Sequence, residues 1–232
     1  MRGLFTSSRA SSSGHDREAP VRQAARAARP ASTIRIHPSA DLDEGVAVGD
    51  GTRVWHLAQI RAGALLGRDV IVGRGAYIGS GVLVGDNCKI QNYALVYEPA
   101  VLEAGVFVGP ATVLTNDRYP RAVNADGSPK SGDDWSAVGV LVREGAAIGA
   151  RCVCVAPVTI GRWAVVGAGA VVLEDVPDFA LVVGAPARRV RWVGRAGVPL
   201  EPVAGSPTTL RCPETGERYE QTGDSELTEV YP

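Results

Sequence analysis

The sequence predicts an all-β fold, a parallel β-helix whose coils are built from six-residue segments, and three features predict it. An apolar residue, most often Val, Ile or Leu, stands at every sixth position of residues 36–114 and again of residues 142–172. Four residues after each of these positions, from Ala40 to Thr112 and again from Ala146 to Val176, the side chain is Ala, Val, Thr or Cys. Glycine and polar residues fill the positions between, where a chain turns most easily.

The period of six fits the side of a triangular coil. The small residue and the next apolar residue are two positions apart, so both face inward from one short strand. Three segments close one coil, so residues 18 apart lie above one another, and coils stack about 4.8 Å apart around a shared apolar column. In the families that carry this pattern the helix is left-handed, so we expect a left-handed parallel β-helix of hexapeptide repeats.

The repeat also divides the chain. Residues 1–31 are rich in Ser, Ala and Arg without periodicity, so we expect a disordered tail. The β-helix is expected over residues 32–178, with an ejected loop at 115–141, where prolines, glycines and acidic residues exclude further coils. Residues 179–194 are expected to form a last strand and a short C-terminal capping helix, and residues 195–232 a loosely ordered tail.

Composition excludes several classes of protein. The chain of 232 residues has a net charge of −1, unlike a nucleic-acid-binding protein. No apolar run approaches the roughly 18 residues of a membrane span, and no secretory signal is visible. The cysteines follow no metal or disulfide spacing, and Cys88, Cys152 and Cys154 fall on inward positions. We expect small core residues in a reducing, cytoplasmic protein.

The coil period groups polar corner residues on three edges of the predicted helix. These groups are His56, Arg74 and Asn92; Glu98 and Asn116; and Asp50, Arg68 and Asp86. The third group alternates acid, base and acid, which is typical of a solvated ladder of surface charges. The first two combine a histidine, an arginine, a carboxylate and two amides, and the second stands at the mouth of the ejected loop. They are the candidate functional residues.

Four segments resemble bacterial nucleotide-sugar N-acetyltransferases. They are VWHLAQI (54–60), KIQNYALVYEPAVLEAGVFVGP (89–110), TNDRYPRA (115–122) and VTIGRWAVVGAGAVVLEDVPDFALVVGAPARRV (158–190). Enzymes of this family acetylate the 3-amino group of a UDP- or dTDP-linked deoxyamino sugar, such as UDP-2-acetamido-3-amino-2,3-dideoxy-glucuronate. The resemblance covers roughly residues 33–194. Its last segment is shared by many hexapeptide acetyltransferases, whereas QNYALVYE and TNDRYPRA are much narrower.

The resemblance implies acetyl-CoA as co-substrate and a homotrimer with active sites between neighbouring subunits. It places Asn92, the asparagine of the QN motif, at the reacting amine. There an amide oxygen could orient the amine and the NH2 group could support the tetrahedral oxyanion. His56, the histidine of the WH motif, is expected to contact the sugar or relay a proton.

The resemblance also suggests the binding residues. Those for the sugar and its diphosphate are Arg74, Gln91, Tyr97, Glu98, Asn116, Arg118, Tyr119 and Arg121. Those for CoA are Gly167, Ala168, Gly184, Ala185, Pro186, Arg188 and Arg189. The chain departs from many relatives by GAPAR in place of GNPAR at 184–188. It also has Thr215 where a zinc-ribbon tail would carry a second cysteine after Cys212, so we expect no metal.

Histidine supply separates the chemistries that such a helix could host. Of the three histidines, only His37 and His56 stand in the coils, so the three ligands of a zinc hydratase are lacking. A hydroxyl acceptor needs a general base, usually histidine, whereas a free amine attacks a thioester unaided. The sequence therefore favours N-acetylation. It leaves two alternatives, O-acetylation of a sugar or antibiotic with His56 as base, and a non-catalytic trimeric scaffold.

Overall fold

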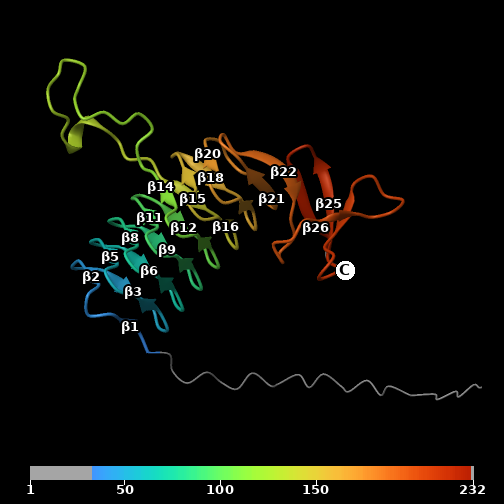
Figure 1. Cartoon of the computed structure of the whole chain (residues 1–232), viewed down its shortest axis with the longest axis horizontal. Coiled ribbons are helices and arrows are strands. Elements are labelled where there is room, and N and C mark those ends of the chain that lie inside the picture. The colour runs from blue at the N-terminus through green and yellow to red at the C-terminus, as the bar shows by residue number, and fades with distance from the viewer. Residues whose placement is uncertain (1–32, 231–232) are drawn as a thin grey trace, which may run out of the picture. The chain divides into compact units, whose positions relative to one another are not determined.

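The computed structural model describes residues 33–230, which form three sheets wound into a β-helix and a four-stranded antiparallel sheet (Figure 1). Sheet A contains β1 (Arg35–Ile36), β4 (Arg53–Val54), β7 (Ile71–Val72), β10 (Lys89–Ile90), β13 (Phe107–Val108), β16 (Ala147–Ile148), β19 (Val165–Val166), β21 (Ala180–Val183) and β22 (Arg188–Trp192). Sheet B contains β2 (Asp41–Leu42), β5 (Gln59–Ile60), β8 (Tyr77–Ile78), β11 (Leu95–Val96), β14 (Val113–Leu114), β17 (Val153–Cys154) and β20 (Val171–Val172).

Sheet C contains β3 (Ala47–Val48), β6 (Leu65–Leu66), β9 (Leu83–Val84), β12 (Val101–Leu102), β15 (Val140–Val142) and β18 (Val158–Ile160). The chain visits sheets A, B and C in turn, and each coil strand before β22 pairs in parallel with the strand one coil away. Ile90, for example, pairs with Val72 in the preceding coil and with Val108 in the following one. The all-β fold and the predicted coil period are confirmed, and the hexapeptide repeats fit the left-handed β-helix.

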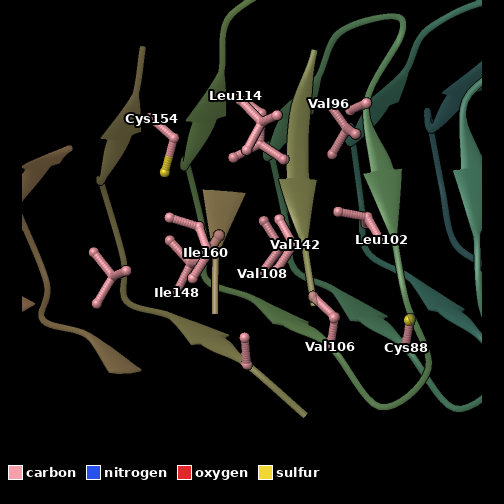
Figure 2. Close-up of a cluster of buried hydrophobic side chains, with 14 of the residues drawn as sticks. Cys88, Val96, Leu102, Val106, Val108, Leu114, Val142, Ile148, Cys154 and Ile160 are labelled. Atoms are coloured by element: carbon pink, nitrogen blue, oxygen red, sulfur yellow. The ribbon is translucent and has the colours of Figure 1, made fainter. Parts of the chain in front are cut away.

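The interior of the β-helix is a continuous apolar column. Figure 2 shows Val96, Leu102, Leu114 and their neighbours pointing inward from all three sheets. All four cysteines are free and buried, as expected for the three in the coils. Burial raises the pKa of the Cys154 thiol to about 12, so this thiol stays protonated at neutral pH. The column therefore holds the cysteines as core residues.

The ejected loop is present. The chain leaves the coils after β14, projects away from them, and returns at β15 (Figure 1). Within the loop, a single 3-10 turn, η1 (Gly132–Asp134), is capped by Ser131. The coil resumes where the main-chain N–H of Val138 donates to the oxygen of Asn116 at 3.0 Å. The returning strand begins at Val140, slightly earlier than the predicted loop end at residue 141.

The expected capping helix at the end of residues 179–194 is wrong. The chain turns at Gly184–Ala187 and returns as β22, which pairs antiparallel with β21. The open edge of β21 offers unpaired main-chain N–H and C=O groups, and a strand satisfies them directly whereas a helix cannot. The structure therefore covers the end of sheet A with a strand.

The tail of residues 195–232 is not loosely ordered where the structure describes it. It forms an antiparallel sheet of β23 (Glu201–Pro202), β24 (Thr209–Arg211), β25 (Arg218–Gly223) and β26 (Glu226–Val230). Tyr219 is fully buried, and its ring lies 5.3 Å edge-on from that of Phe179 in the last coil. Arg195 forms an ion pair with Glu229. The buried ring of Tyr219 and the ion pair of Arg195 therefore hold the C-terminal sheet in place.

The expected disordered tail, residues 1–31, lies outside the described residues. Within residues 33–230, no helix has the length and apolarity that a bilayer span requires. The same residues contain no group of three or more His, Cys, Asp or Glu side chains placed to hold a metal ion.

Candidate active site

The candidate site lies on the A–B corner, where each coil passes from sheet A to sheet B. His56, Arg74 and Asn92 stack there as the period predicts, because Gly75 donates its N–H to the oxygen of His56 and Tyr93 to that of Arg74. With Trp55, Ile71, Gly73 and Gln91, they line an open depression of about 330 Å³. We call His56, Arg74 and Asn92 the polar segment of the A–B corner.

Asn92 is held in one orientation by the neighbouring coil. Its Oδ1 accepts a hydrogen bond of 2.8 Å from the main-chain N–H of Arg74. Because that N–H needs an acceptor, the amide oxygen must face it, and the two N–H groups of Nδ2 are left for a ligand. The expected role of the amide oxygen in orienting an amine is therefore taken up by the backbone, and the donor role remains.

Gly73 makes this orientation possible. A Cβ atom at this position would lie 2.5 Å from the nitrogen of Asn92 and 2.7 Å from its Oδ1. Only glycine leaves the space in which the amide folds back over the preceding coil. Sequence reasoning missed Gly73, although it directly precedes Arg74 at the start of the same corner, one coil before Asn92.

His56 belongs to an aromatic stack that the sequence did not reveal. Its ring lies 3.4 Å from the ring of His37, centroid to centroid, with an angle of 27° between the planes. The indole of Trp55 lies 6.3 Å from His56 and almost parallel to it. The Nδ1 atom of His37 accepts the main-chain N–H of Ser39 at 3.2 Å. By the coil period, His37 lies directly above or below Trp55, the residue before His56. This register is the only feature of the sequence that indicates the contact between His37 and His56.

Arg74 is restrained on the same corner. Its Nε donates to the hydroxyl oxygen of Tyr93 at 3.1 Å. Tyr93 itself sits in the turn at a φ of 59°, with an exposed ring. The guanidinium therefore stands at the depression with one of its donors already used.

The second predicted group lies on the B–C corner, so one chain does not bring it to Asn92. The Oε2 atom of Glu98 is buried against Gly79 and has no hydrogen-bond partner among the described residues. Tyr97 packs on Tyr77 with ring centroids 5.1 Å apart. The pKa of the Tyr77 hydroxyl is raised, mainly by burial and secondly by the negative charge of Glu98. Asn116 follows β14 at the base of the ejected loop.

The predicted loop residues are exposed and stand apart from the polar segment. The guanidinium of Arg118 lies 5.4 Å from the ring centroid of Tyr119, which is 72% exposed. Arg121 lines a separate hollow of about 390 Å³ with Lys130 and Trp135. Within one chain these residues form no common site with Asn92.

The third group, on the C–A corner, contains the expected surface ion pair. Asp86 and Arg68 approach to 3.0 Å. The main-chain N–H of Arg68, followed by its guanidinium, holds the pKa of Asp86 below its ordinary value. The Arg68 side chain is 72% exposed and that of Asp86 36%, so this pair contributes little beyond local order.

The A–B corner continues beyond Asn92 as a run of small residues. The same position in the following coils is occupied by Pro110, Ala150 and Ala168. The residue after each of them donates its main-chain N–H to the oxygen of the corner residue one coil earlier, at 2.8–3.0 Å. Gly184 follows at the end of this row, where its oxygen accepts the N–H of Val171. We call Pro110, Ala150 and Ala168 the small-residue segment.

The residues predicted to bind CoA lie at the far end of this segment. Gly167 and Ala168 follow β19, and Gly184, Ala185 and Pro186 form the turn between β21 and β22. Arg188 is exposed and 3.9 Å from Glu174. Arg189 instead lies 4.2 Å from the ring centroid of Trp192 and donates to the oxygen of Asp224. Arg188 is therefore the freer of the two cations.

Comparison with known proteins first gives a class. The family described as "Hexapeptide repeat of succinyl-transferase" matches residues 63–93 and 138–174, which lie in the coils of the β-helix. Among particular relatives, the bifunctional protein GlmU of Polaromonas naphthalenivorans is 34% identical over 155 residues, which are 64% of this chain and 28% of GlmU. The dTDP-3-amino-3,6-dideoxy-alpha-D-galactopyranose 3-N-acetyltransferase of Aneurinibacillus thermoaerophilus is 56% identical over 48 residues, 21% of this chain and 25% of that enzyme.

The chain spans between 25% and 40% of the length of such relatives. The solved structures similar to it include the following two. PerB of Caulobacter crescentus, in complex with CoA and GDP-perosamine, aligns at 24% identity over 69% of this chain and 58% of PerB, with a TM-score of 0.36. A variant of AntD, an N-acyltransferase of Bacillus cereus in complex with dTDP and coenzyme A, aligns at 18% identity over 70% of this chain and 82% of AntD, with a TM-score of 0.45.

Proposed function

We propose that the chain is an acyltransferase that uses acetyl-CoA to acetylate the 3-amino group of a UDP- or dTDP-linked deoxyamino sugar. One observation carries the proposal, the change of chemistry along the A–B corner at Asn92. The polar segment, which ends at Asn92, lines a depression suited to a sugar. After it lies the small-residue segment, which presents no long side chain at this position to an extended pantetheine arm. The two substrates would meet at Asn92.

The anchored amide of Asn92 supports a mechanism of direct amine attack. The free amine forms a bond to the thioester carbonyl carbon, and the carbonyl oxygen becomes a tetrahedral oxyanion. The Nδ2 group of Asn92 donates a hydrogen bond to that oxygen, where preorganised donors are most effective. As the C–S bond breaks, the CoA thiolate leaves and takes the excess proton from nitrogen. No strong protein base is required, because the amine attacks unprotonated.

The remaining residues would bind the two substrates. His56, Arg74 and Gln91 line the depression and would contact the sugar. Backbone groups of Gly167 and Ala168 would meet the pantetheine arm. The adenine end would lie at the turn of Gly184, Ala185 and Pro186, with Arg188 near its phosphates; Arg189, engaged with Trp192 and Asp224, would act mainly in holding that turn.

A homotrimer would complete the site, and the outer faces of two sheets support it. Outward positions of sheet C form an apolar row in register, Leu65, Leu83, Val101 and Leu141. Sheet B carries a similar row, Leu95, Val113, Val153 and Val171. The corresponding row of sheet A is mixed, Arg35, Arg53, Ile71, Lys89 and Phe107. Apolar rows on two faces fit contacts with two neighbouring copies.

In such a trimer, the second predicted group would come from a neighbouring subunit. Tyr97, Glu98, Asn116 and the loop residues Arg118, Tyr119 and Arg121 flank the corner between the two apolar faces. The buried, unpartnered oxygen of Glu98 supports a bound donor there, because a buried carboxylate oxygen without a partner is costly.

The test is thiol release from acetyl-CoA by the full chain, with UDP- and dTDP-linked 3-amino sugars as acceptors and a colorimetric thiol reagent. The buried cysteines of the protein give little background in this assay. We expect release with an amino sugar and none with the matched 3-hydroxy sugar. No release with any amine acceptor would remove the proposal.

The position of His56 favours one second candidate. Its imidazole lines the same depression as Asn92, so a general base is available for a hydroxyl acceptor. An O-acetyltransferase would release thiol with the 3-hydroxy sugar and would lose that activity on His56→Asn. The proposed N-acetyltransferase would keep most of its turnover in this variant.

A further inference from the structure

A second depression adjoins the polar segment on its N-terminal side. It has a volume of about 300 Å³, and its lining includes Arg35, His37, Pro38, Arg53 and Trp55. Trp55 also lines the depression that holds His56 and Asn92. The stacked rings of His37 and His56 join the two hollows at the same place. One elongated ligand can therefore occupy both.

The second depression carries two arginines side by side. Arg35 and Arg53 pair in direct register on β1 and β4, and both are exposed. Some arginines of the coils form ion pairs, as Arg61 does with Asp43 at 3.0 Å and Arg143 with Glu103 at 3.1 Å. No carboxylate of the described residues forms an ion pair with Arg35 or Arg53. Two adjacent guanidinium groups without an acid attract an anion, and their forked donors match phosphate oxygens.

Trp55 supplies a flat surface beside these charges. Its side chain is 47% exposed, and its ring is held nearly parallel to that of His56, with 10° between the planes. An exposed indole held in place in a hollow beside cations is a surface on which a nucleobase stacks. The depression thus pairs anion recognition with base recognition, which together describe a nucleotide.

The spacing along the β-helix agrees with such a ligand. Arg53 lies two coils before Asn92, a separation of about 10 Å along the helix axis by the distance between neighbouring strands. Arg74 stands on the coil between them. This axial separation leaves room for one sugar ring and its attached phosphate. A diphosphate at Arg53 therefore leaves the sugar at Arg74 and Asn92.

We propose that Arg35, Arg53 and Trp55 form the subsite for the nucleoside diphosphate end of the acceptor, with the arginines on the diphosphate and the indole on the base. This inference rests on the proposed function, since it names the part of the substrate that anchors the sugar at Asn92. It also assigns the diphosphate to the first coils of the chain rather than to Arg118 and Arg121 of the ejected loop.

Calorimetric titration of UDP and of dTDP into the full chain tests the subsite. Arg53→Gln and Arg35→Gln are each expected to raise the Kd about 10-fold, as for the loss of one charge-assisted hydrogen bond. The matched control is Lys89→Gln, which removes the same charge from the same face of sheet A and is expected to leave the Kd unchanged. Unchanged binding in both arginine variants, with weaker binding in Arg121→Gln, would overturn the proposal.

Trp55→Leu provides an independent arm. We expect it to weaken UDP and dTDP binding about 10-fold and to leave the weaker binding of inorganic pyrophosphate unchanged, because only the nucleotides carry a base to stack. An equal loss for all three ligands would contradict base stacking. Arginine and tryptophan side chains here are exposed, so thermal melting of each variant is expected to match the parent chain.

Turnover separates this inference from the proposed function. Thiol release with a KM that rises about 10-fold in Arg53→Gln, at unchanged kcat, supports both. Thiol release with a KM insensitive to Arg53→Gln overturns the subsite and leaves the function. Nucleotide binding that depends on Arg53, without thiol release from any amino sugar, overturns the function and leaves the subsite.

Discussion

The side-chain oxygen of Asn92 accepts a hydrogen bond of 2.8 Å from the main-chain N–H of Arg74, the residue one coil earlier on the same corner. Asp86 makes the equivalent contact with the N–H of Arg68 on another corner, at 2.7 Å. One structural device is thus built with two different side chains, and only asparagine keeps an NH2 group for a ligand. This contact separates the structural role of Asn92 from its proposed catalytic role.

Asn92→Asp is expected to keep the fold and lose the reaction. The carboxylate retains the acceptor for the N–H of Arg74, as Asp86 does for Arg68, but removes the donor and adds a negative charge beside the oxyanion. Turnover should fall by about 10²–10³-fold while the thermal midpoint stays unchanged. Asn92→Ala should show the same kinetic loss together with a lower midpoint. Full activity in Asn92→Asp would confine this residue to scaffolding.

Gly73→Ala should disturb the hydrogen bond between the Asn92 side chain and the Arg74 main chain. Its new Cβ atom would meet the backbone nitrogen of Asn92, which cannot move without its coil. We expect a loss of about 1–3 kcal/mol in the free energy of unfolding, measured in urea, and a reduced kcat. Gly132→Ala is the control, since a Cβ there meets nothing within 4 Å. Equal stability of the two variants would contradict the contact.

Alkaline pH should destabilise the protein through its buried thiol. Burial raises the pKa of Cys154 to about 12, above the ordinary value of 9.0 that the unfolded chain regains. Between these values the folded state binds more protons, so stability is complete below pH 9 and falls as the pH rises toward about 12. Cys154→Val, which resembles its neighbour Val172, should flatten this dependence in urea unfolding series. An unchanged slope would assign the effect to other groups, such as Tyr219.

Tyr219→Ala should destabilise the C-terminal sheet. The ring is fully buried against Phe179, and its hydroxyl accepts the N–H of Arg195 at 3.1 Å. Loss of this anchor should lower the free energy of unfolding by about 3–5 kcal/mol. Tyr119→Ala makes the same chemical change at a ring that is 72% exposed, and should change stability by less than about 0.5 kcal/mol. Similar values for the two variants would mean that the sheet is not held by this ring.

Leu83→Glu should dissociate the proposed trimer. This side chain is 44% exposed on the apolar outer row of sheet C, where a charge could not be buried against a second copy. Light scattering should give the mass of three subunits for the parent chain and of one for the variant. Lys89→Glu, on the outer face of sheet A, should remain trimeric. A parent chain with the mass of one subunit would remove the shared site.

The coil architecture could be predicted in detail because every repeat states the same rule. A single period fixes strand direction, register and the stacking of corner residues. The sequence alone therefore places Arg74 and Asn92 next to each other. The orientation of the Asn92 amide could not be predicted, since it depends on a side chain folding over Gly73 in the preceding coil. The stack of His37 on His56 depends in the same way on side-chain conformation.

Prediction failed where the repeat ends. The run Arg188–Trp192 carries no sixfold pattern, and its strand conformation is decided by the open edge of β21. The tail sheet is likewise fixed by distant contacts, such as that between Tyr219 and Phe179. Non-local pairing of this kind leaves little trace in local composition.

The ejected loop has a consequence for how this protein can change. Leu102 pairs with Val84 of the coil before the loop and with Val142 of the coil after it, in the same parallel register. The strand register is therefore the same across the ejected loop as across an ordinary corner. Loops of other lengths and sequences can be exchanged at this point without retuning the coils, which makes it the natural place to engineer a new acceptor preference.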